Sequence, residues 1–314
     1  MLPALLVLTA TALTAAHLRA RRVRRAEAEC AARLPLGPDG TVDGAGPISL
    51  DAGTGAPAVL LLHGGGDTPQ TLRYLAEHLH ARGFTVRAPL LPGHGRAVRE
   101  FADVSADAWL AHARAELDAL RAVHDWVAVV GLSMGGAIAV RLAATASDLP
   151  ALCLVAPYLA MPPLVRGVAR SAPLWGSVVP YVRVSDGRRP SIADPEERAR
   201  SLAYGWFTPA ALRALAATVD RAAAALPRVT APTFVAHSRD DNRIAPDAAL
   251  RAFARLGAAE KQLVWVPGAH VVTVDLGRAQ LFDAVERWLE ARLPERSDRA
   301  RRGREVEGAP GRAV

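Results

Sequence analysis

A glycine-rich turn between an apolar strand and an alanine-rich helix constrains this chain more than any other feature. Residues 126–130 are apolar and indicate a buried strand, residues 131–136 read Gly-Leu-Ser-Met-Gly-Gly, and residues 137–143 have the composition of a helix. A serine between a strand and a helix lies on a very tight, strained turn, and only glycine at Gly131 and Gly135 lets the neighbouring chain pass that close. The stretch therefore predicts that Ser133 stands at the end of a strand in an α/β fold.

This Gly-x-Ser-x-Gly turn is typical of a nucleophile elbow, in which the strain holds a serine hydroxyl clear of the backbone. The start of the following helix supplies N–H groups aimed at developing negative charge. The competing interpretation is a glycine-rich turn whose serine merely caps the helix. The apolar strand before Ser133 and the helix after it favour the nucleophile.

Strands and helices alternate on both sides of the turn. Apolar runs indicate strands at 48–50, 58–62, 84–89, 151–156, 232–237 and 262–266, and helical patterns cover 71–82, 105–123, 246–256 and 278–293. This alternation predicts a mostly parallel central sheet with helices on both faces, built from residues 47–156 and 229–293. Between them, at residues 157–228, prolines separate short amphipathic helices, which we interpret as an inserted helical cap.

The basic residues of the 314-residue chain are concentrated at its two ends. Residues 1–33 carry six arginines against two glutamates, residues 294–314 carry six arginines against four acids, and together they supply +6 of the formal charge of +7. A nucleic-acid-binding protein gathers basic residues on one folded face with aromatic residues between them, so we expect no nucleic-acid partner. The charged, Gly- and Pro-containing tail at 294–314 is predicted to be disordered.

The N-terminal segment, residues 1–34, is apolar at first and then rich in arginine. Residues 2–18 carry no charge, and five arginines follow by residue 25, which is the reverse of the order in a secretory signal. A run of this length is near the ~17-residue lower limit for a membrane-spanning helix, and the arginines after it favour an enzyme body in the cytoplasm. Membrane contact through residues 2–18 competes with a frayed amphipathic extension and with a wrongly chosen start codon.

A serine nucleophile needs a general base, and that base needs an acid to orient it. In an open parallel sheet these groups lie beyond the carboxyl ends of the strands, in the order serine, acid, histidine. Asp240 and Asp241 directly follow the strand that ends at His237, and we favour Asp241. His270 follows the strand that ends at Val266, with a short glycine-containing loop between them. The alternatives are an Asx turn with a helix cap for the aspartates and a plain loop histidine for His270.

An oxyanion hole needs two backbone donors. One is the N–H of Met134, and the other is expected from the loop after the strand 58–62, with Gly65 preferred and Gly66 as the alternative. No Gly-Lys-Ser/Thr follows the three glycines, and no dinucleotide fingerprint is present, so no cofactor is expected. Two cysteines without metal-ligand spacing predict neither a disulfide nor a metal site.

Five stretches of the chain resemble the α/β-hydrolase family. They are Leu-Leu-Leu-His-Gly at 60–64, Ala-Pro-Leu-Leu-Pro-Gly-His-Gly at 88–95, Gly-Leu-Ser-Met-Gly-Gly at 131–136, the run from 231 to Asp241, and Ala-His-Val-Val-Thr-Val-Asp at 269–275. Within it they are similar to small capped bacterial carboxylesterases and monoacylglycerol lipases. The resemblance covers about residues 47 to 293. It implies the triad Ser133, Asp241 and His270, with Gly65 and Met134 as oxyanion donors. Gly65 departs from the bulky residue that is frequent there, and the cap matches poorly.

These residues predict a serine hydrolase that cleaves a small-molecule acyl ester, with a medium-chain ester or a monoacylglycerol as the expected substrate. Acyl transfer and the cleavage of thioesters or amides use the same triad and stay open. A catalytically inactive, membrane-tethered scaffold is the alternative from another class. The sequence does not determine the oligomeric state.

Overall fold

The computed structural model describes residues 2–184 and 190–294, with only the backbone of residues 2–9, 11 and 12. Its centre is a seven-stranded sheet in the order β1-β3-β2-β4-β5-β8-β9. The edge strand β1 is antiparallel to β3, and every other neighbouring pair is parallel. The strands are β1 (Ile48–Leu50), β2 (Ala58–Leu62), β3 (Thr85–Ala88), β4 (Val127–Leu132), β5 (Leu152–Val155), β8 (Thr233–His237) and β9 (Lys261–Trp265).

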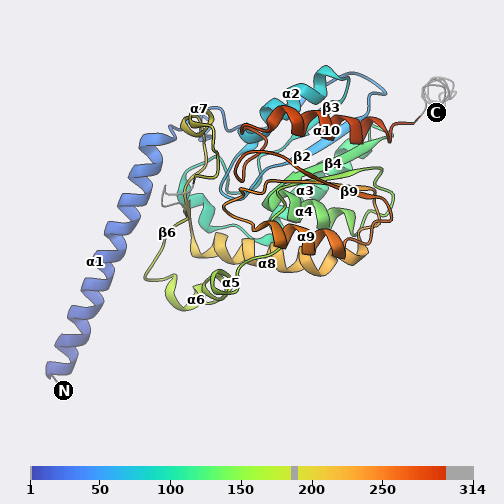
Figure 1. Ribbon diagram of the computed structural model, residues 1–314. Coiled ribbons are helices and arrows are strands. Elements are labelled where there is room, and N and C mark those ends of the chain that lie inside the picture. The colour runs from blue at the N-terminus through green and yellow to red at the C-terminus, as the bar shows by residue number, and fades with distance from the viewer. Residues whose placement is uncertain (1, 185–189, 295–314) are drawn as a thin grey trace, which may run out of the picture.

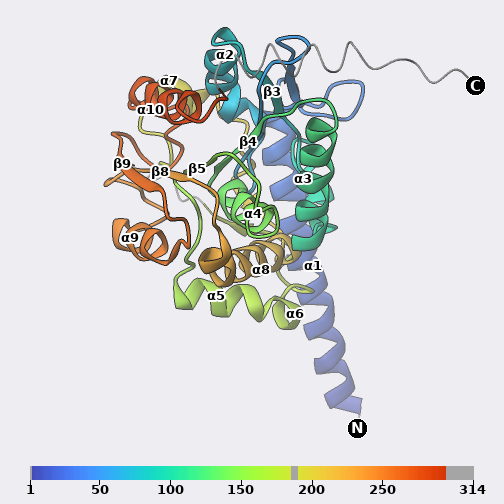
Figure 2. The same cartoon turned by 90° about the vertical axis from the view of Figure 1, so that its right-hand side faces the viewer.

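Helices cover both faces of the sheet, as predicted. On one face lie α2 (Arg73–Ala81) and α10 (Arg278–Glu290), and on the other lie α3 (Ala106–Arg121), α4 (Met134–Ala143), α8 (Pro209–Ala225) and α9 (Pro246–Arg255) (Figure 2). The central strands β2 and β4 are buried along their whole length, so alternate residues enter two separate cores. Leu60 and Val129 pack with the α3, α4 and α8 layer, whereas Val59 and Val130 pack with α2 and α10. This is why the strands appear in the sequence as continuous apolar runs.

The segment predicted as a cap lies between β5 and β8. It contains α5 (Pro163–Arg170), α6 (Ala172–Trp175), α7 (Pro195–Ala199) and α8, and a two-stranded antiparallel ribbon of β6 (Val182–Arg183) and β7 (Trp206–Phe207). The ribbon is too short to leave a periodic signal, and no strand was expected there. α8 packs against α4, which itself contacts the sheet, and α5 and α6 lie beyond α8 (Figures 1 and 2). The longest helix of this segment is therefore attached to the core through α4.

Some predicted helices begin or end elsewhere. The helix expected at 71–82 starts as a 3-10 turn, η1 (Pro69–Leu72), which Thr68 caps, before α2 continues it. Among the short helices expected in the cap, α7 is a single turn, which Asp194 caps by accepting from the amides of Glu196 and Glu197. Two further 3-10 turns, η2 (Val98–Ala102) and η3 (Leu226–Arg228), join elements of the covering layer.

The N-terminal segment forms one continuous helix, α1 (Leu2–Arg33). Its second half is attached to the body, because Ala26 and Cys30 are buried in the core that contains α3 and α4. Its first half projects away from the body in both views (Figures 1 and 2). Within the described ranges, no helix has the length and apolar character needed to span a bilayer, and the predicted span at 2–18 therefore finds no support. The tail predicted to be disordered lies, apart from residue 294, outside the described residues.

Candidate active site

Ser133 lies between β4 and α4 in a backbone conformation that residues with a side chain rarely adopt. Its φ is 54° and its ψ is −115°, and such strain persists only where the surroundings enforce it. A Cβ atom at Gly131 would lie 2.4 Å from the carbonyl oxygen of Gly135, and one at Gly135 would lie 2.0 Å from the carbonyl oxygen of Leu62. The close approach predicted for these two glycines is therefore confirmed.

The structure brings Ser133, Asp241 and His270 together from three distant parts of the chain. His270 Nε2 lies 2.8 Å from Ser133 Oγ, and His270 Nδ1 lies 2.8 Å from Asp241 Oδ2. An ionised carboxylate only accepts hydrogen bonds, so Nδ1 carries the proton and Nε2 is free to accept one from the serine hydroxyl. Asp240, the alternative acid, is instead exposed to solvent. This arrangement can move a proton from a serine hydroxyl to an imidazole.

The environment of Asp241 keeps its carboxylate ionised. The side chain is fully buried, which would raise its pKa, but the His270 ring and the amides of Arg243 and Ile244 donate to it and lower the pKa below its ordinary value. On its other side lies His237, whose Nε2 is 3.1 Å from the carbonyl oxygen of Ile244 and 3.6 Å from Asp241 Oδ2. Burial lowers the pKa of His237, so this ring lies neutral beside the acid.

The loop after β2 lies against the serine turn. A Cβ atom at Gly64 would be 3.5 Å from Ser133 Cβ, and one at Gly65 would be 3.2 Å from Met134 Sδ. Met134 is the first residue of α4, so its N–H has no acceptor within the helix. Gly65 and Met134 thus lie side by side next to the serine.

His63 and Gly66 fix the shape of this loop. The His63 ring contacts the carbonyl oxygen of Gly64 through Nδ1 and accepts from the amide of Leu91 through Nε2, so it braces the loop from within the core. Gly66 has a positive φ of 72°, and its carbonyl oxygen accepts from the amide of Tyr204. A Cβ atom at Gly66 would lie 2.7 Å from the Phe207 ring, so β7 covers the loop closely.

Asp275 is a polar residue of the site to which no role was assigned from the sequence. Its carboxylate is fully buried and accepts four backbone N–H groups, at distances of 2.7 to 2.9 Å. Two of these belong to Ala269, beside His270, and to Leu276, and two belong to Ala193 and Asp194 of the cap segment. Burial would raise the pKa of Asp275, but these four hydrogen bonds lower it below its ordinary value. The carboxylate therefore joins the histidine loop to the cap.

Three further hydrogen bonds attach the same cap segment to the site. Arg243, next to the acid, donates to the Ser191 hydroxyl and to the carbonyl oxygen of Val184, and the amide of Val271 donates to the carbonyl oxygen of Ser191. The loops that carry Asp241 and His270 are thus both hydrogen-bonded to the cap. No periodic pattern in the sequence predicts such contacts between distant segments of the chain.

Asp67 is a buried acid close to the glycine loop. Its Oδ1 accepts from the amide of Thr68 at 2.9 Å, and burial raises its pKa to about 7. The positive charge that His270 can carry acts in the opposite direction. A carboxyl group that titrates near neutral pH beside the triad is a feature that sequence reasoning missed, because its signal is burial alone.

Among the described residues, one cluster has the spacing to hold a metal ion, and it consists of His78, Asp283 and Glu286 on α2 and α10. Its members are not those of the triad. The Arg82 guanidinium, 3.0 Å from Glu286, already neutralises that carboxylate. His78 also contacts Glu286 at 2.7 Å. The arrangement fits an ion-pair network that joins the two helices.

Comparison with known proteins identifies the family. A family model described as serine aminopeptidase, S33, matches residues 55–275. The chain is 28% identical over 250 residues to a thermostable monoacylglycerol lipase of Bacillus sp. (strain H-257), covering 79% of this chain and 94% of the relative. It is 26% identical over 239 residues to a carboxylesterase of Bacillus subtilis (strain 168), covering 75% and 93%.

Solved structures agree on the fold. A metagenome-derived lipolytic enzyme superposes with a TM-score of 0.71 at 27% identity, over 80% of this chain and 99% of the other. A monoacylglycerol lipase of Paleococcus ferrophilus gives a TM-score of 0.66 at 20% identity, over 79% and 98%. The fold predicted from the sequence is thereby confirmed, and the chain belongs to the S33 serine aminopeptidase family of α/β hydrolases.

Proposed function

We propose that this protein cleaves carboxylic esters through a catalytic triad of Ser133, His270 and Asp241 and a covalent acyl-enzyme. It is a carboxylic ester hydrolase, in keeping with relatives named monoacylglycerol lipase and carboxylesterase. The observation that carries the mechanism is the pair of 2.8 Å contacts from the His270 ring, one to Ser133 and one to Asp241. Base, nucleophile and orienting acid have these mutual positions in serine hydrolases.

In the first half of the reaction, Ser133 Oγ forms a bond to the ester carbonyl carbon while its proton moves to His270 Nε2. The N–H groups of Gly65 and Met134 donate to the resulting oxyanion. The tetrahedral intermediate collapses, the bond to the leaving oxygen breaks, and His270 gives its proton to the leaving alcohol. In the second half, His270 takes a proton from water, the hydroxide attacks the acyl-enzyme, and Ser133 recovers its proton as the acid leaves.

The substrate class we propose is a medium-chain acyl ester or a monoacylglycerol. The cap segment places apolar side chains near the serine turn. Phe207 packs on the glycine loop, and the amide of Tyr158 donates to the carbonyl oxygen of Ser133. Leu159 and Met161 follow in the same buried core. A Cβ atom at Gly65 would lie 3.2 Å from Met134 Sδ and 3.6 Å from the Phe207 ring, so these two side chains occupy the space that a larger residue would take.

An ester panel tests both parts of the proposal. The full chain is assayed with p-nitrophenyl esters of increasing acyl length and with monoacylglycerols, beside Ser133→Ala. We expect activity to peak at intermediate chain length and to be abolished in Ser133→Ala, whose melting temperature should equal that of the wild type. Hydrolysis by Ser133→Ala at the wild-type rate would exclude Ser133 as the nucleophile.

A second candidate is amide hydrolysis, which the description of the matching family model favours. Amides and thioesters carrying the best acyl group of the panel separate this candidate from ester cleavage. Added alcohol acceptors, followed by product analysis, separate hydrolysis from acyl transfer. An amide turned over faster than the matched ester would make the peptidase-like activity the principal one.

A further inference from the structure

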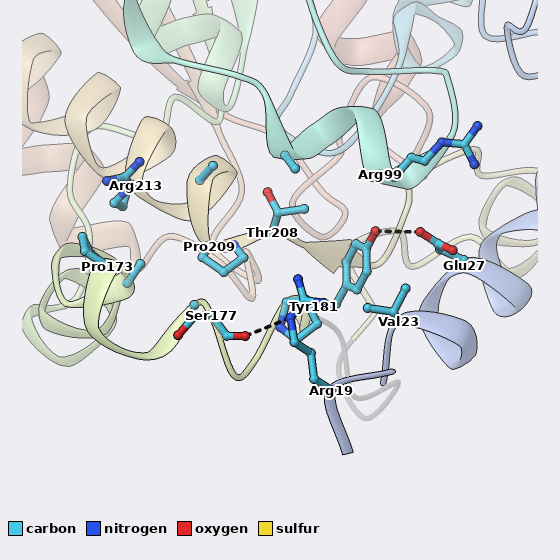
Figure 3. Close-up of a pocket in the computed structure, with 15 residues that line it drawn as sticks. Arg19, Val23, Glu27, Arg99, Pro173, Ser177, Tyr181, Thr208, Pro209 and Arg213 are labelled. Atoms are coloured by element: carbon cyan, nitrogen blue, oxygen red, sulfur yellow. Dashed lines mark hydrogen bonds between the residues drawn. The ribbon is translucent and has the colours of Figure 1, made fainter. Parts of the chain in front are cut away.

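A pocket lies away from the triad, where α1, η2, α6 and α8 meet, and it has a volume of about 500 Å³ (Figure 3). Its basic side chains come from three separate elements: Arg19 from α1, Arg99 from η2 and Arg213 from α8. In Figure 3 the three stand on different sides of the pocket, around Pro209 and Tyr181. None of the residues assigned to the triad or to the oxyanion hole lines it.

The arginines of this pocket are not neutralised by neighbouring acids. Arg19 donates to the carbonyl oxygen of Ser177 at 2.9 Å, and neither Arg99 nor Arg213 forms an ion pair with any described residue. The one carboxylate in the lining, Glu27, lies 3.3 Å from the Tyr181 hydroxyl. Three guanidinium groups against one carboxylate make the pocket a site for an anion.

The rest of the lining is apolar, so the anion that fits carries an apolar part. Val23, Pro173, Pro180 and Pro209 form much of the wall between the arginines. Tyr181 is the single aromatic residue of the lining, so the stacking platforms that single-stranded nucleic acids require are missing from it. A phosphate group attached to glycerol and acyl chains satisfies both the basic rim and the apolar wall.

The surface next to the pocket exposes large apolar side chains. Leu174 directly follows Pro173 of the lining and is 84% exposed, and Leu164 on α5 is 80% exposed. Val168 and Val178 on the same segment are exposed as well. The views of Figures 1 and 2 agree that α5, α6 and the projecting half of α1 all lie at the same end of the molecule. A free fatty acid or inorganic phosphate would occupy the pocket but leave these leucines in water.

We propose that this face binds the surface of an anionic phospholipid membrane, with a lipid phosphate among Arg19, Arg99 and Arg213 and with Leu164 and Leu174 entering the interface. Basic groups at a bilayer surface attract anionic headgroups, and apolar side chains beside them enter the region between headgroups and acyl chains. This binding does not depend on the catalytic role of Ser133. It also needs no helix that crosses the bilayer.

Vesicle co-sedimentation of the full chain tests the proposal. The wild type should bind vesicles of mixed phosphatidylglycerol and phosphatidylcholine and leave pure phosphatidylcholine vesicles largely unbound. Arg99→Gln/Arg213→Gln should lower the partition coefficient on the anionic vesicles by about 30-fold, since each basic residue near such a surface contributes roughly a factor of five. The matched control is Arg228→Gln/Arg251→Gln, which removes two exposed arginines outside this pocket and should change it less than threefold.

A second pair of variants tests the apolar contact. Leu174→Gln should weaken vesicle binding about tenfold, whereas Leu250→Gln, at an exposed leucine of α9, should leave it unchanged. Equal losses in the two arginine pairs, equal binding to neutral vesicles, or no binding to anionic vesicles would each overturn the proposal. So would a dimer in light scattering that Leu174→Gln dissociates, because the face would then cover a second copy of the chain. Melting temperatures within about 2 °C of the wild type establish that each variant is folded.

Discussion

The carboxylate of Asp275 should be needed both for stability and for the position of His270, and Asp275→Asn tests this. Four backbone N–H groups converge on its two oxygens at 2.7 to 2.9 Å in a fully buried position. An asparagine has nearly the same shape but keeps a single acceptor oxygen. Two of the four N–H groups therefore lose their acceptor and face an NH₂ group instead.

The magnitude follows from those two lost hydrogen bonds. A hydrogen bond to a charged acceptor contributes about 1.5–3 kcal/mol, so Asp275→Asn should lower the free energy of unfolding by about 3–6 kcal/mol. In a domain of this size the melting temperature should fall by about 10 °C. Because Ala269 is one of the four donors and precedes His270, kcat should also fall by about 10- to 100-fold, as expected for a base displaced by a fraction of an ångström.

The assay combines urea unfolding with steady-state hydrolysis of a short p-nitrophenyl ester at 15 °C, where the variant is folded. Asp118→Asn, at an exposed carboxylate of α3, is the matched control and should change neither quantity. The pKa of Asp275 is lowered on folding, so its contribution to stability is present above the ordinary pKa of aspartate and is lost as the pH falls through the lowered value. The stability difference should therefore be constant from pH 5 to 8 and shrink below about pH 4. Wild-type stability with wild-type kcat in Asp275→Asn would refute the reasoning.

Other positions give further expected outcomes. Asp67→Asn should become more stable than the wild type as the pH rises from about 4 to 7, by up to about 4 kcal/mol. Burial raises the pKa of this acid to about 7, so its ionisation opposes folding of the wild type. Unfolding curves at pH 4, 6 and 8 measure the stability difference, and a difference independent of pH would contradict the prediction. Asp241→Asn should lower kcat by about 1,000- to 10,000-fold, because the imidazole loses the acceptor that fixes its tautomer. Its melting temperature should stay within a few degrees of the wild type, and retention of a tenth of the activity would argue against the triad. Gly135→Ala should abolish soluble expression or lower the free energy of unfolding by more than about 4 kcal/mol, because its Cβ would lie 2.0 Å from the carbonyl oxygen of Leu62. The control is Gly167→Ala in α5, whose Cβ meets no atom within 4 Å and which should stabilise the protein by about 0.5–1 kcal/mol.

The sheet and the proximity of Ser133, Asp241 and His270 could be predicted because their signals are local. Buried parallel strands give continuous apolar runs, and Ser133, Asp241 and His270 each follow such a run directly, where the carboxyl ends of the strands meet. The observed strands of the central sheet agree with the predicted ones to within two residues. The strained turn at Ser133 was predictable for the same reason, because glycines two residues before and after a serine permit the close backbone approach that such a turn requires.

The remaining features depend on contacts between distant segments, which leave no periodic pattern. The importance of Asp275 arises only when residues 193 and 194 fold onto the histidine loop, and its sequence position suggests nothing of the kind. The helix α1 was expected as an apolar run followed by arginines. It is one continuous helix whose second half is held by core contacts of Ala26 and Cys30. The basic pocket likewise joins arginines that are far apart in the chain.

Active-site labelling tests the proposed catalytic chemistry most directly. The full chain is treated with a fluorophosphonate probe, digested and examined by mass spectrometry, beside His270→Ala and Ser133→Ala. An activated serine held 2.8 Å from an imidazole should be labelled stoichiometrically at Ser133 in the wild type, at least 100-fold more slowly in His270→Ala, and not at all in Ser133→Ala. Hydrolytic activity that survives while Ser133 stays unlabelled, or stoichiometric labelling of another serine, would contradict it.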